Sequence, residues 1–279
     1  MSDAGTVTGR ILRRVSGLLR AGEARTAKAF DGVESYCMFI GYPRSGHSLV
    51  GSLLDAHPNA VIAHELDALQ RVQEGITREE LYRLLVRNSR GFTDSGREWN
   101  GYSYEVPGQW QGRFERLAVI GDKKGGASSK RLSADATLLD RLERTVGARP
   151  KLVHVVRNPY DNIGAMFRER APSRSLEDIV RWYLLLCETN AGIKARVGED
   201  SVFDLRHEEL VEHPRRVLSE LCRFLGLRPG DDYLESCAGV VFSSLRRSRH
   251  DVPWNPASVA AVRRATETYD FLDGYSYDE

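Results

Sequence analysis

The residues with the clearest chemical potential form one short run, Gly41-Tyr42-Pro43-Arg44-Ser45-Gly46-His47-Ser48. A strand-forming apolar stretch at 36–40 precedes it. Leucine and valine at helical spacing follow it, until His57-Pro58 ends the pattern. A strand, a glycine-bearing turn and a helix together point backbone N–H groups and a helix N-terminus at one anion. The sequence therefore predicts an anion-binding loop at residues 41–48.

The spacing of the two glycines matches the phosphate-binding motif G-x-x-x-x-G-K-[ST], but His47 occupies the lysine position. The fixed positive charge is Arg44, inside the loop. The lysine that reaches the outer phosphates of ATP is therefore missing, which favours a phosphate whose transferring group is contacted from another side. An ATP-dependent kinase is the alternative activity, and a tight strand–helix turn without a ligand is the alternative structure.

Residues 43–49, followed by Leu-Leu-Asp-Ala-His-Pro at 53–58, resemble the 5′-phosphosulfate loop of sulfotransferases that use 3′-phosphoadenosine 5′-phosphosulfate (PAPS). The loop is most similar to that of tyrosylprotein sulfotransferases and related bacterial enzymes. The resemblance implies that the 5′-phosphosulfate is held by Arg44, Ser45, Gly46, His47 and Ser48. It also implies a role for Lys123, which follows a strand predicted at 117–120 and would reach the bridging or sulfuryl oxygens. No metal is expected.

The acceptor hydroxyl needs a base, and Glu65 is the candidate. It follows a short strand at 60–63, and its spacing from Arg44 is similar to that of the catalytic glutamate of the tyrosylprotein enzymes. A carboxylate can accept the proton if desolvation raises its pKa. His64 is the alternative base, and a helix-capping or salt-bridged carboxylate is the alternative interpretation of Glu65.

A second phosphate site is indicated by Arg157-Asn158-Pro159-Tyr160-Asp161, after a strand at 151–156. Pro159 suits the first position of a helix, which places Arg157 at a helix N-terminus; a surface salt bridge is the alternative. The segment resembles the 3′-phosphate segment of sulfotransferases, in which a serine follows eight residues after the arginine. Here that residue is Ala165, which also leaves open a non-catalytic nucleotide-binding protein.

Other basic residues are expected to complete the nucleotide site. Arg168 or the run Arg246, Arg247 and Arg249 would substitute for the missing serine, although such a run can also be a solvated face. His207 stands at the family's tyrosine position, which borders the adenine. Residues 90–116 lack periodicity and place aromatic side chains among glycines. These pack on the core or form an acceptor pocket for a sugar or a phenolic ring, with Trp99, Tyr102, Tyr104 and Trp110 as its candidate residues.

These residues require a sheet whose strands end at one edge. Nearly continuous apolar runs at 36–40, 117–120 and 151–156 suit a parallel sheet covered on both faces. Helices are predicted after Thr77, over 132–146, from Pro159 and after Ser175. The fold class is α/β, a three-layer P-loop fold with a central, mostly parallel sheet flanked by helices. The expected organisation is a basic amphipathic helix at 1–30, packed on the domain or lying on a membrane surface, and one sulfotransferase domain at 31–279.

The composition limits the classes of partner. Forty basic and thirty-nine acidic residues give a net charge of +1, so global charge offers no argument for nucleic acid. No apolar run approaches the roughly 18 residues of a membrane span. Four scattered cysteines without metal-ligand spacing indicate reduced, buried thiols and a cytoplasmic protein. The expected partner is a hydroxylated small molecule or sugar; the sequence does not define the oligomeric state.

Overall fold

A computed structural model describes residues 28–171, 173–242 and 244–278. Its centre is a five-stranded sheet in the order β2-β5-β1-β6-β7, and every pair of neighbouring strands is parallel. The strands are β1 (Ser35–Gly41), β2 (Ala60–His64), β5 (Val119–Lys123), β6 (Lys151–Val156) and β7 (Val202–Arg206). All five therefore end at the same edge, where open α/β sheets bind ligands. Most of the predicted helix at 1–30 lies outside the described residues.

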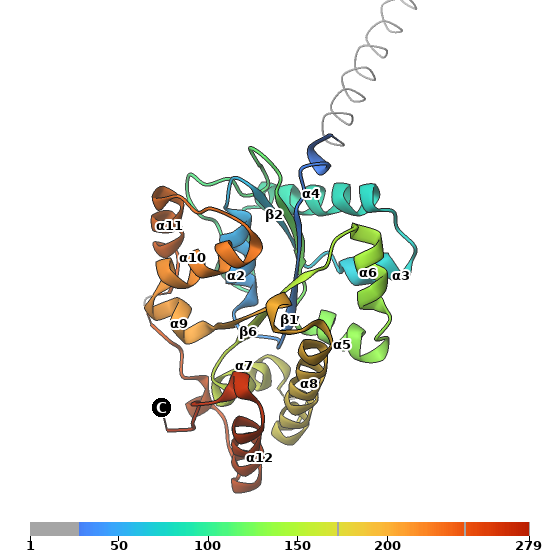
Figure 1. The fold of residues 1–279 in the computed structure, drawn as a ribbon. Helices are drawn as coiled ribbons and strands as arrows, with labels where there is room; N and C mark the ends of the chain where they lie inside the picture. Colours follow the sequence, from blue (N-terminus) through green and yellow to red (C-terminus); the bar gives the residue numbers. More distant parts are fainter. Residues whose placement is uncertain (1–27, 172, 243, 279) are drawn as a thin grey trace, which may run out of the picture.

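Helices cover both faces of the sheet (Figure 1). Side chains of β1 alternate between the two layers: Cys37 and Phe39 pack with the helices of one layer, whereas Tyr36, Met38 and Ile40 pack with those of the other. The first layer contains α2 (His47–Asp55), α9 (His207–Glu212), α10 (Pro214–Leu225) and α11 (Asp231–Ala238). The predicted three-layer α/β fold is confirmed.

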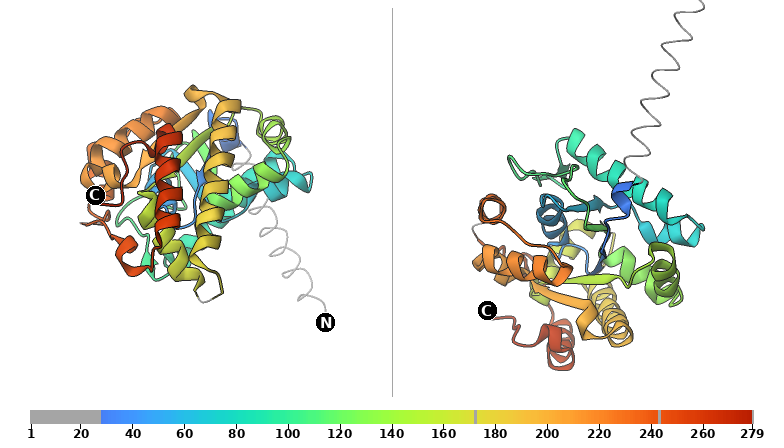
Figure 2. Two further views of the ribbon diagram at one scale, coloured as in Figure 1. Left: turned by 90° about the horizontal axis from the view of Figure 1, so that it is seen from below. Right: turned by 45° about the horizontal axis from the view of Figure 1, so that its top comes forward.

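The opposite layer contains α3 (Ala68–Gln73), α4 (Arg78–Asp94), α5 (Gly126–Ala134), α6 (Leu138–Val146) and α8 (Leu176–Val197). Beyond the sheet edge, α7 (Pro159–Arg170) and α12 (Pro256–Thr268) pack on α8, and α12 lies beside it in Figure 2. The capping boxes that begin α4 and α8 are present: Thr77 pairs with Glu80, and Ser175 pairs with Asp178.

The single helix predicted at 132–146 is wrong, because the chain forms two helices there, α5 and α6. Asp135 is extended (φ −143°, ψ 94°) and its carboxylate accepts hydrogen bonds from Thr137 N at 3.0 Å and Thr137 Oγ1 at 2.6 Å. A short polar side chain that bonds its own backbone two residues on competes with helical pairing. The strand predicted at 117–120 is also displaced, since β5 begins at Val119 and includes Lys123.

The aromatic stretch after α4 forms a small hairpin, β3 (Glu98–Trp99) with β4 (Tyr102–Ser103), rather than a plain loop. All four cysteines are free and buried, as predicted. Among the described residues, no helix is long and apolar enough to cross a bilayer.

Candidate active site

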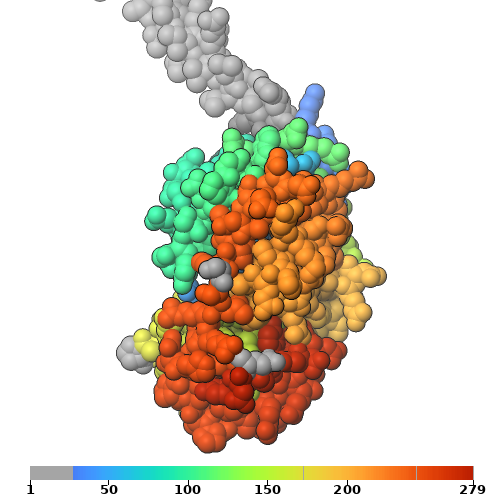
Figure 3. All heavy atoms as spheres, turned by 90° about the vertical axis from the view of Figure 1, so that its left-hand side faces the viewer, coloured from blue at the N-terminus to red at the C-terminus, as the bar shows by residue number. Residues whose placement is uncertain are grey.

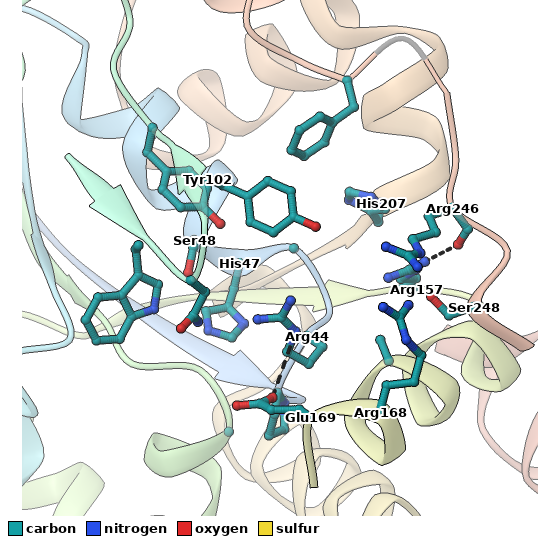
Figure 4. Close-up of a pocket in the computed structure, with 18 of the residues that line it drawn as sticks. Arg44, His47, Ser48, Tyr102, Arg157, Arg168, Glu169, His207, Arg246 and Ser248 are labelled. Atoms are coloured by element: carbon teal, nitrogen blue, oxygen red, sulfur yellow. Dashed lines mark hydrogen bonds and ion pairs between the residues drawn. The ribbon is translucent and has the colours of Figure 1, made fainter. Parts of the chain in front are cut away.

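Each strand of the sheet delivers one residue to a single cavity of about 860 Å³ at the common edge. Beyond the ends of β1, β2, β5, β6 and β7, in that order, the lining residues are Arg44, Glu65, Lys124, Arg157 and His207. Figure 4 labels Arg44, Arg157 and His207 among them, together with residues of the hairpin, of α7 and of the segment that leads into η2 (Ser248–Asp251). A pocket of this volume suits a ligand of nucleotide size, because small-molecule sites occupy roughly 300–1,000 Å³.

The loop between β1 and α2 has the backbone that anion binding requires. The backbone of Gly46 is left-handed (φ 100°), and this residue caps α2 without any side-chain hydrogen bond, so no side chain occupies the helix N-terminus, where anions bind. A Cβ on Gly46 would lie 2.6 Å from His207 Nδ1, and this contact explains the glycine. The loop is tied to α7, because Asn162 Nδ2 donates to Pro43 O at 2.7 Å.

Glu65 is held by two lysines at the floor of the cavity. Lys123 Nζ lies 2.6 Å from Glu65 Oε1 and 3.0 Å from Ser48 Oγ, and Lys124 Nζ lies 2.9 Å from Glu65 Oε2. Burial by itself would raise the pKa of Glu65, but the neighbouring His47 ring and the two ammonium groups outweigh it, so the pKa lies well below its ordinary value. In the free protein Glu65 is therefore ionised and fully paired.

The carboxylate of Asp122 fixes the chain around Glu65. It accepts hydrogen bonds from Leu66 N at 3.1 Å and Ala68 N at 2.8 Å. The backbone of Glu65 itself is in the left-handed conformation (φ 59°). Burial raises the pKa of Asp122 to about 6. A non-glycine residue with positive φ is uncommon and needs such support from its surroundings.

Two histidines near Glu65 lie in different surroundings. His47 lines the cavity, with Nε2 3.8 Å from Glu65 Oε1 and Nδ1 3.4 Å from Ser45 Oγ, and burial lowers its pKa. His64 does not line the cavity; it lies behind Trp99, with ring centroids 5.0 Å apart, and stacks on Phe92 at 4.0 Å. Burial and then the Lys123 charge lower the pKa of His64 to about 3.

The opposite end of the cavity is basic. Arg157, Arg168 and Arg246 line it together with Ala165 and Ser248. Arg157 is 9% exposed, and its Nη2 donates to Arg246 O. Arg168 and Arg246 are more exposed, and each lies near Asp251, at 3.4 and 3.5 Å. The two carboxylates that line the cavity pair with other residues than these three arginines: Glu65 contacts the lysines, and Glu169 lies 3.9 Å from Arg44.

Aromatic side chains form the remaining wall. Trp99 and Tyr102 of the hairpin, Tyr104 and Phe242 line the cavity. Tyr102 and Phe242 meet edge to face with centroids 5.6 Å apart, which joins the hairpin to the segment before η2. Figure 3 shows that the green residues near 100 and the orange residues near 240 lie on one face of the molecule. Trp99, Tyr102 and Phe242 are 37–43% exposed, so they offer apolar surface to a ligand at the entrance of the cavity.

Residues 38–232 match the model of the sulfotransferase family. The chain belongs to the sulfotransferase family. The sulfotransferase domain of the olefin synthase of Synechococcus PCC 7002 has a similar fold, with a TM-score of 0.56 and 19% identity over 85% of this chain and 94% of that one. The sulfotransferase domain of the curacin biosynthetic pathway gives a TM-score of 0.56 and 17% identity, over 85% of this chain and 99% of that one. Family membership selects an enzyme of sulfuryl transfer over the ATP-dependent kinase and the non-catalytic protein.

The structure of this sulfotransferase brings most of the predicted residues into one cavity. The predicted residues that line it are Arg44, Gly46, His47, Ser48, Glu65, Trp99, Tyr102, Tyr104, Arg157, Arg168, His207 and Arg246. Ser45 and Lys123 lie just beneath, at 0% and 1% exposure. Four further predicted residues also lie outside the lining, namely His64, Trp110, Arg247 and Arg249.

Arg249 and Trp110 have contacts elsewhere in the fold. Arg249 is 3% exposed, and its Nη2 lies 2.7 Å from Asp161 Oδ2, while Nη1 donates to Ser276 O and Tyr277 O at 2.8 and 2.7 Å. Its guanidinium therefore binds η2 to α7 and to the C-terminal segment. Trp110 packs under Arg113, whose Cζ lies 5.8 Å from the ring centre.

Sequence reasoning missed several lining residues of the sulfotransferase, including Lys124, Glu169, Phe242 and Ser248. Lys124 could have been predicted from the sequence, because side chains of neighbouring residues at the end of a strand point to opposite sides. Of two adjacent lysines, only one could enter the cavity. Phe242 and Ser248 carry no local signal, since they reach the site through tertiary packing.

Proposed function

We propose that this sulfotransferase transfers the sulfuryl group of PAPS to a hydroxyl group of a small-molecule or carbohydrate acceptor. One observation carries the proposal: a single cavity joins an uncapped helix N-terminus, a lysine–glutamate cluster, a three-arginine end and an aromatic wall. A donor with a phosphosulfate at one end and a ribose phosphate at the other matches the two basic regions. An acceptor with a flat ring or sugar face matches the aromatic wall.

The donor loop would bind the 5′-phosphosulfate through the amides of α2 and the charge of Arg44. Charge-assisted contacts of this kind are about twice as strong as neutral hydrogen bonds. His207 has an unpartnered Nδ1 against the loop, and burial together with Arg157 lowers its pKa to about 4, so the ring is neutral. A neutral ring beside the loop suits the purine of the donor.

In the reaction, the acceptor oxygen forms a bond to sulfur while the bond from sulfur to the phosphate oxygen breaks, and 3′-phosphoadenosine 5′-phosphate (PAP) leaves. The acceptor proton goes to Glu65. The negative charge that grows on the leaving phosphate is stabilised by Lys124 and by the loop amides. Positioning and electrostatic stabilisation supply most of the catalysis in such an in-line transfer.

Glu65 must lose part of its pairing before it can accept a proton. The anionic oxygens of the donor compete with its carboxylate for Lys124, whose ammonium group lines the cavity and lies 2.9 Å from Glu65 in the free protein. Weaker pairing within a buried site raises the pKa of a carboxylate. Donor binding would thereby convert Glu65 from a structural anion into a base.

Ligand-induced stabilisation tests the choice of donor. PAP should raise the melting temperature of the protein in the absence of magnesium, because binding to the folded state alone stabilises it. ATP with magnesium should give a much smaller shift. A larger shift with ATP and magnesium than with PAP would contradict the proposal.

A further inference from the structure

The basic end of the cavity lacks the serine that its resemblance to sulfotransferases implies. Ala165 lines this end, one helical turn before Arg168 on α7, while Arg157 lies just ahead of the first turn of that helix. A methyl group cannot donate a hydrogen bond to a phosphate. If the donor carries a 3′-phosphate here, a hydroxyl must come from another element.

Ser248 places a hydroxyl at this position from the opposite side. Its side chain is 1% exposed, lines the cavity and has no hydrogen-bond partner among the described residues. In Figure 4 Ser248 is drawn beside the guanidinium groups of Arg157 and Arg168. Buried hydroxyl groups nearly always have a partner, so an unpartnered one beside two arginines indicates a missing anionic ligand.

The packing of η2 on α7 fixes Ser248 in this place. A Cβ on Gly164 would lie 2.6 Å from Ser248 O, so the two backbones are in direct contact. Asp161 then holds the next residue, because it accepts hydrogen bonds from Arg249 N at 2.9 Å, Arg249 Nε at 3.1 Å and Arg249 Nη2 at 2.7 Å. The hydroxyl is thus presented by a rigid support rather than by a free loop.

We infer that the Ser248 hydroxyl donates a hydrogen bond to the 3′-phosphate of the donor and replaces the serine that is absent at position 165. Arg157 and Arg168 supply the positive charge around the same phosphate. The assignment deepens the proposed function and rests on it. It makes Ser248 a residue that distinguishes a 3′-phosphorylated adenosine nucleotide from one without that phosphate.

Calorimetry with PAP and with adenosine 5′-phosphate tests this role, using wild type and Ser248→Ala. A hydrogen bond to a charged group corresponds to roughly a tenfold or greater change in affinity. Ser248→Ala should therefore bind PAP about tenfold or more weakly, with the affinity for adenosine 5′-phosphate unchanged. Without nucleotide the variant should melt at or above the wild-type temperature, because it loses only an unpartnered buried hydroxyl.

Ser35→Ala is the matched control, since Ser35 Oγ is also buried and unpartnered but lies at the start of β1, at the far edge of the sheet. It should leave both affinities unchanged. The double variant Ala165→Ser/Ser248→Ala should recover part of the preference for PAP, which a general disturbance of the site would not allow.

The possible results distinguish an error in the assignment of Ser248 from an error in the proposed donor. If wild type prefers PAP and Ser248→Ala keeps the same preference, the assignment of Ser248 is wrong while PAPS remains the donor. If wild type binds neither nucleotide, or binds both equally, the proposed donor is wrong and the role of Ser248 falls with it.

Discussion

Lys123 Nζ lies 2.6 Å from Glu65 Oε1, and the lysine side chain is 1% exposed. Lys124, the next residue, contacts the other oxygen of the same carboxylate but faces the cavity. The two lysines therefore have different positions relative to a bound ligand. Lys123 supports the floor of the site, and Lys124 lines the cavity, where it can contact an anion.

This difference predicts distinct effects for the two lysines. Lys124→Ala should weaken PAP binding roughly tenfold, because one charge-assisted contact is lost, with little change in the melting temperature. Lys123→Ala should lower the melting temperature as well, since it removes the buried lysine that is the closest partner of the partly buried Glu65 carboxylate. Lys130→Ala, at an exposed position of α5, is the control for charge alone. Equal effects of Lys123→Ala and Lys124→Ala on both readouts would contradict the division of roles.

Arg44→Ala should weaken PAP binding and reduce turnover by orders of magnitude, because Arg44 is the fixed charge of the donor loop. Arg174→Ala provides a control of equal charge change at an exposed position outside the cavity. Titration calorimetry and initial rates measure the two effects. An Arg44→Ala enzyme with wild-type affinity and rate would place the phosphosulfate elsewhere.

Glu65→Gln keeps the shape of the side chain and removes the proton acceptor. Its kcat should fall by roughly 10²–10⁴-fold with PAP affinity nearly unchanged. Glu74→Gln, on an exposed turn, should have no effect. Near-normal turnover by Glu65→Gln would remove Glu65 as the base, and His47, the histidine that lines the cavity, would be tested next.

The pH dependence of the wild-type rate follows from the same contacts. In the free protein the pKa of Glu65 is depressed, so the carboxylate stays ionised as the pH falls below the ordinary range of a glutamate. The acidic limb of kcat/KM for the donor, which reports free enzyme, should thus lie below about pH 4. The acidic limb of the kcat profile, which reports the enzyme with donor bound, should lie at higher pH, because the donor then competes with Glu65 for its lysine partner. Coincident limbs would show that donor binding does not release Glu65.

Asp161→Asn should lower the free energy of unfolding by roughly 3–5 kcal/mol, because it leaves the buried Arg249 without its counter-charge. Chemical denaturation measures the change. Arg181→Ala removes an exposed pair with Asp178 and should cost no more than about 1 kcal/mol. A similarly small loss for Asp161→Asn would contradict a structural role for Arg249.

Local patterns predicted the elements and the loop. The apolar run before Gly41, the glycine spacing and the helix starts after Thr77 and Ser175 each depend on neighbouring residues, and each is present in the fold. The break at Asp135 was missed because the apolar periodicity continues across it, and a side-chain bond to Thr137 interrupts the helix.

The direction of functional side chains was harder to predict. His64 closes β2 and stacks on Phe92, so its neighbour Glu65 alone faces the cavity. Arg249 looks like part of a nucleotide-binding run, yet its partner Asp161 lies 88 residues away in the chain. Ser248 reaches the site through the same contact between η2 and α7. Such pairings arise from tertiary packing, which spacing along the chain does not encode.

The most direct test of the central claim is sulfuryl transfer itself. The wild-type protein is incubated with PAPS radiolabelled at sulfur and with pooled hydroxylated small molecules and sugars, and Glu65→Gln and Arg44→Ala serve as controls. We predict that label passes to one or more acceptors without added metal, that PAP forms in equal amount, and that both variants lose this transfer. If the wild type transfers no label to any acceptor, or if Glu65→Gln transfers it at the wild-type rate, the account of this site is contradicted.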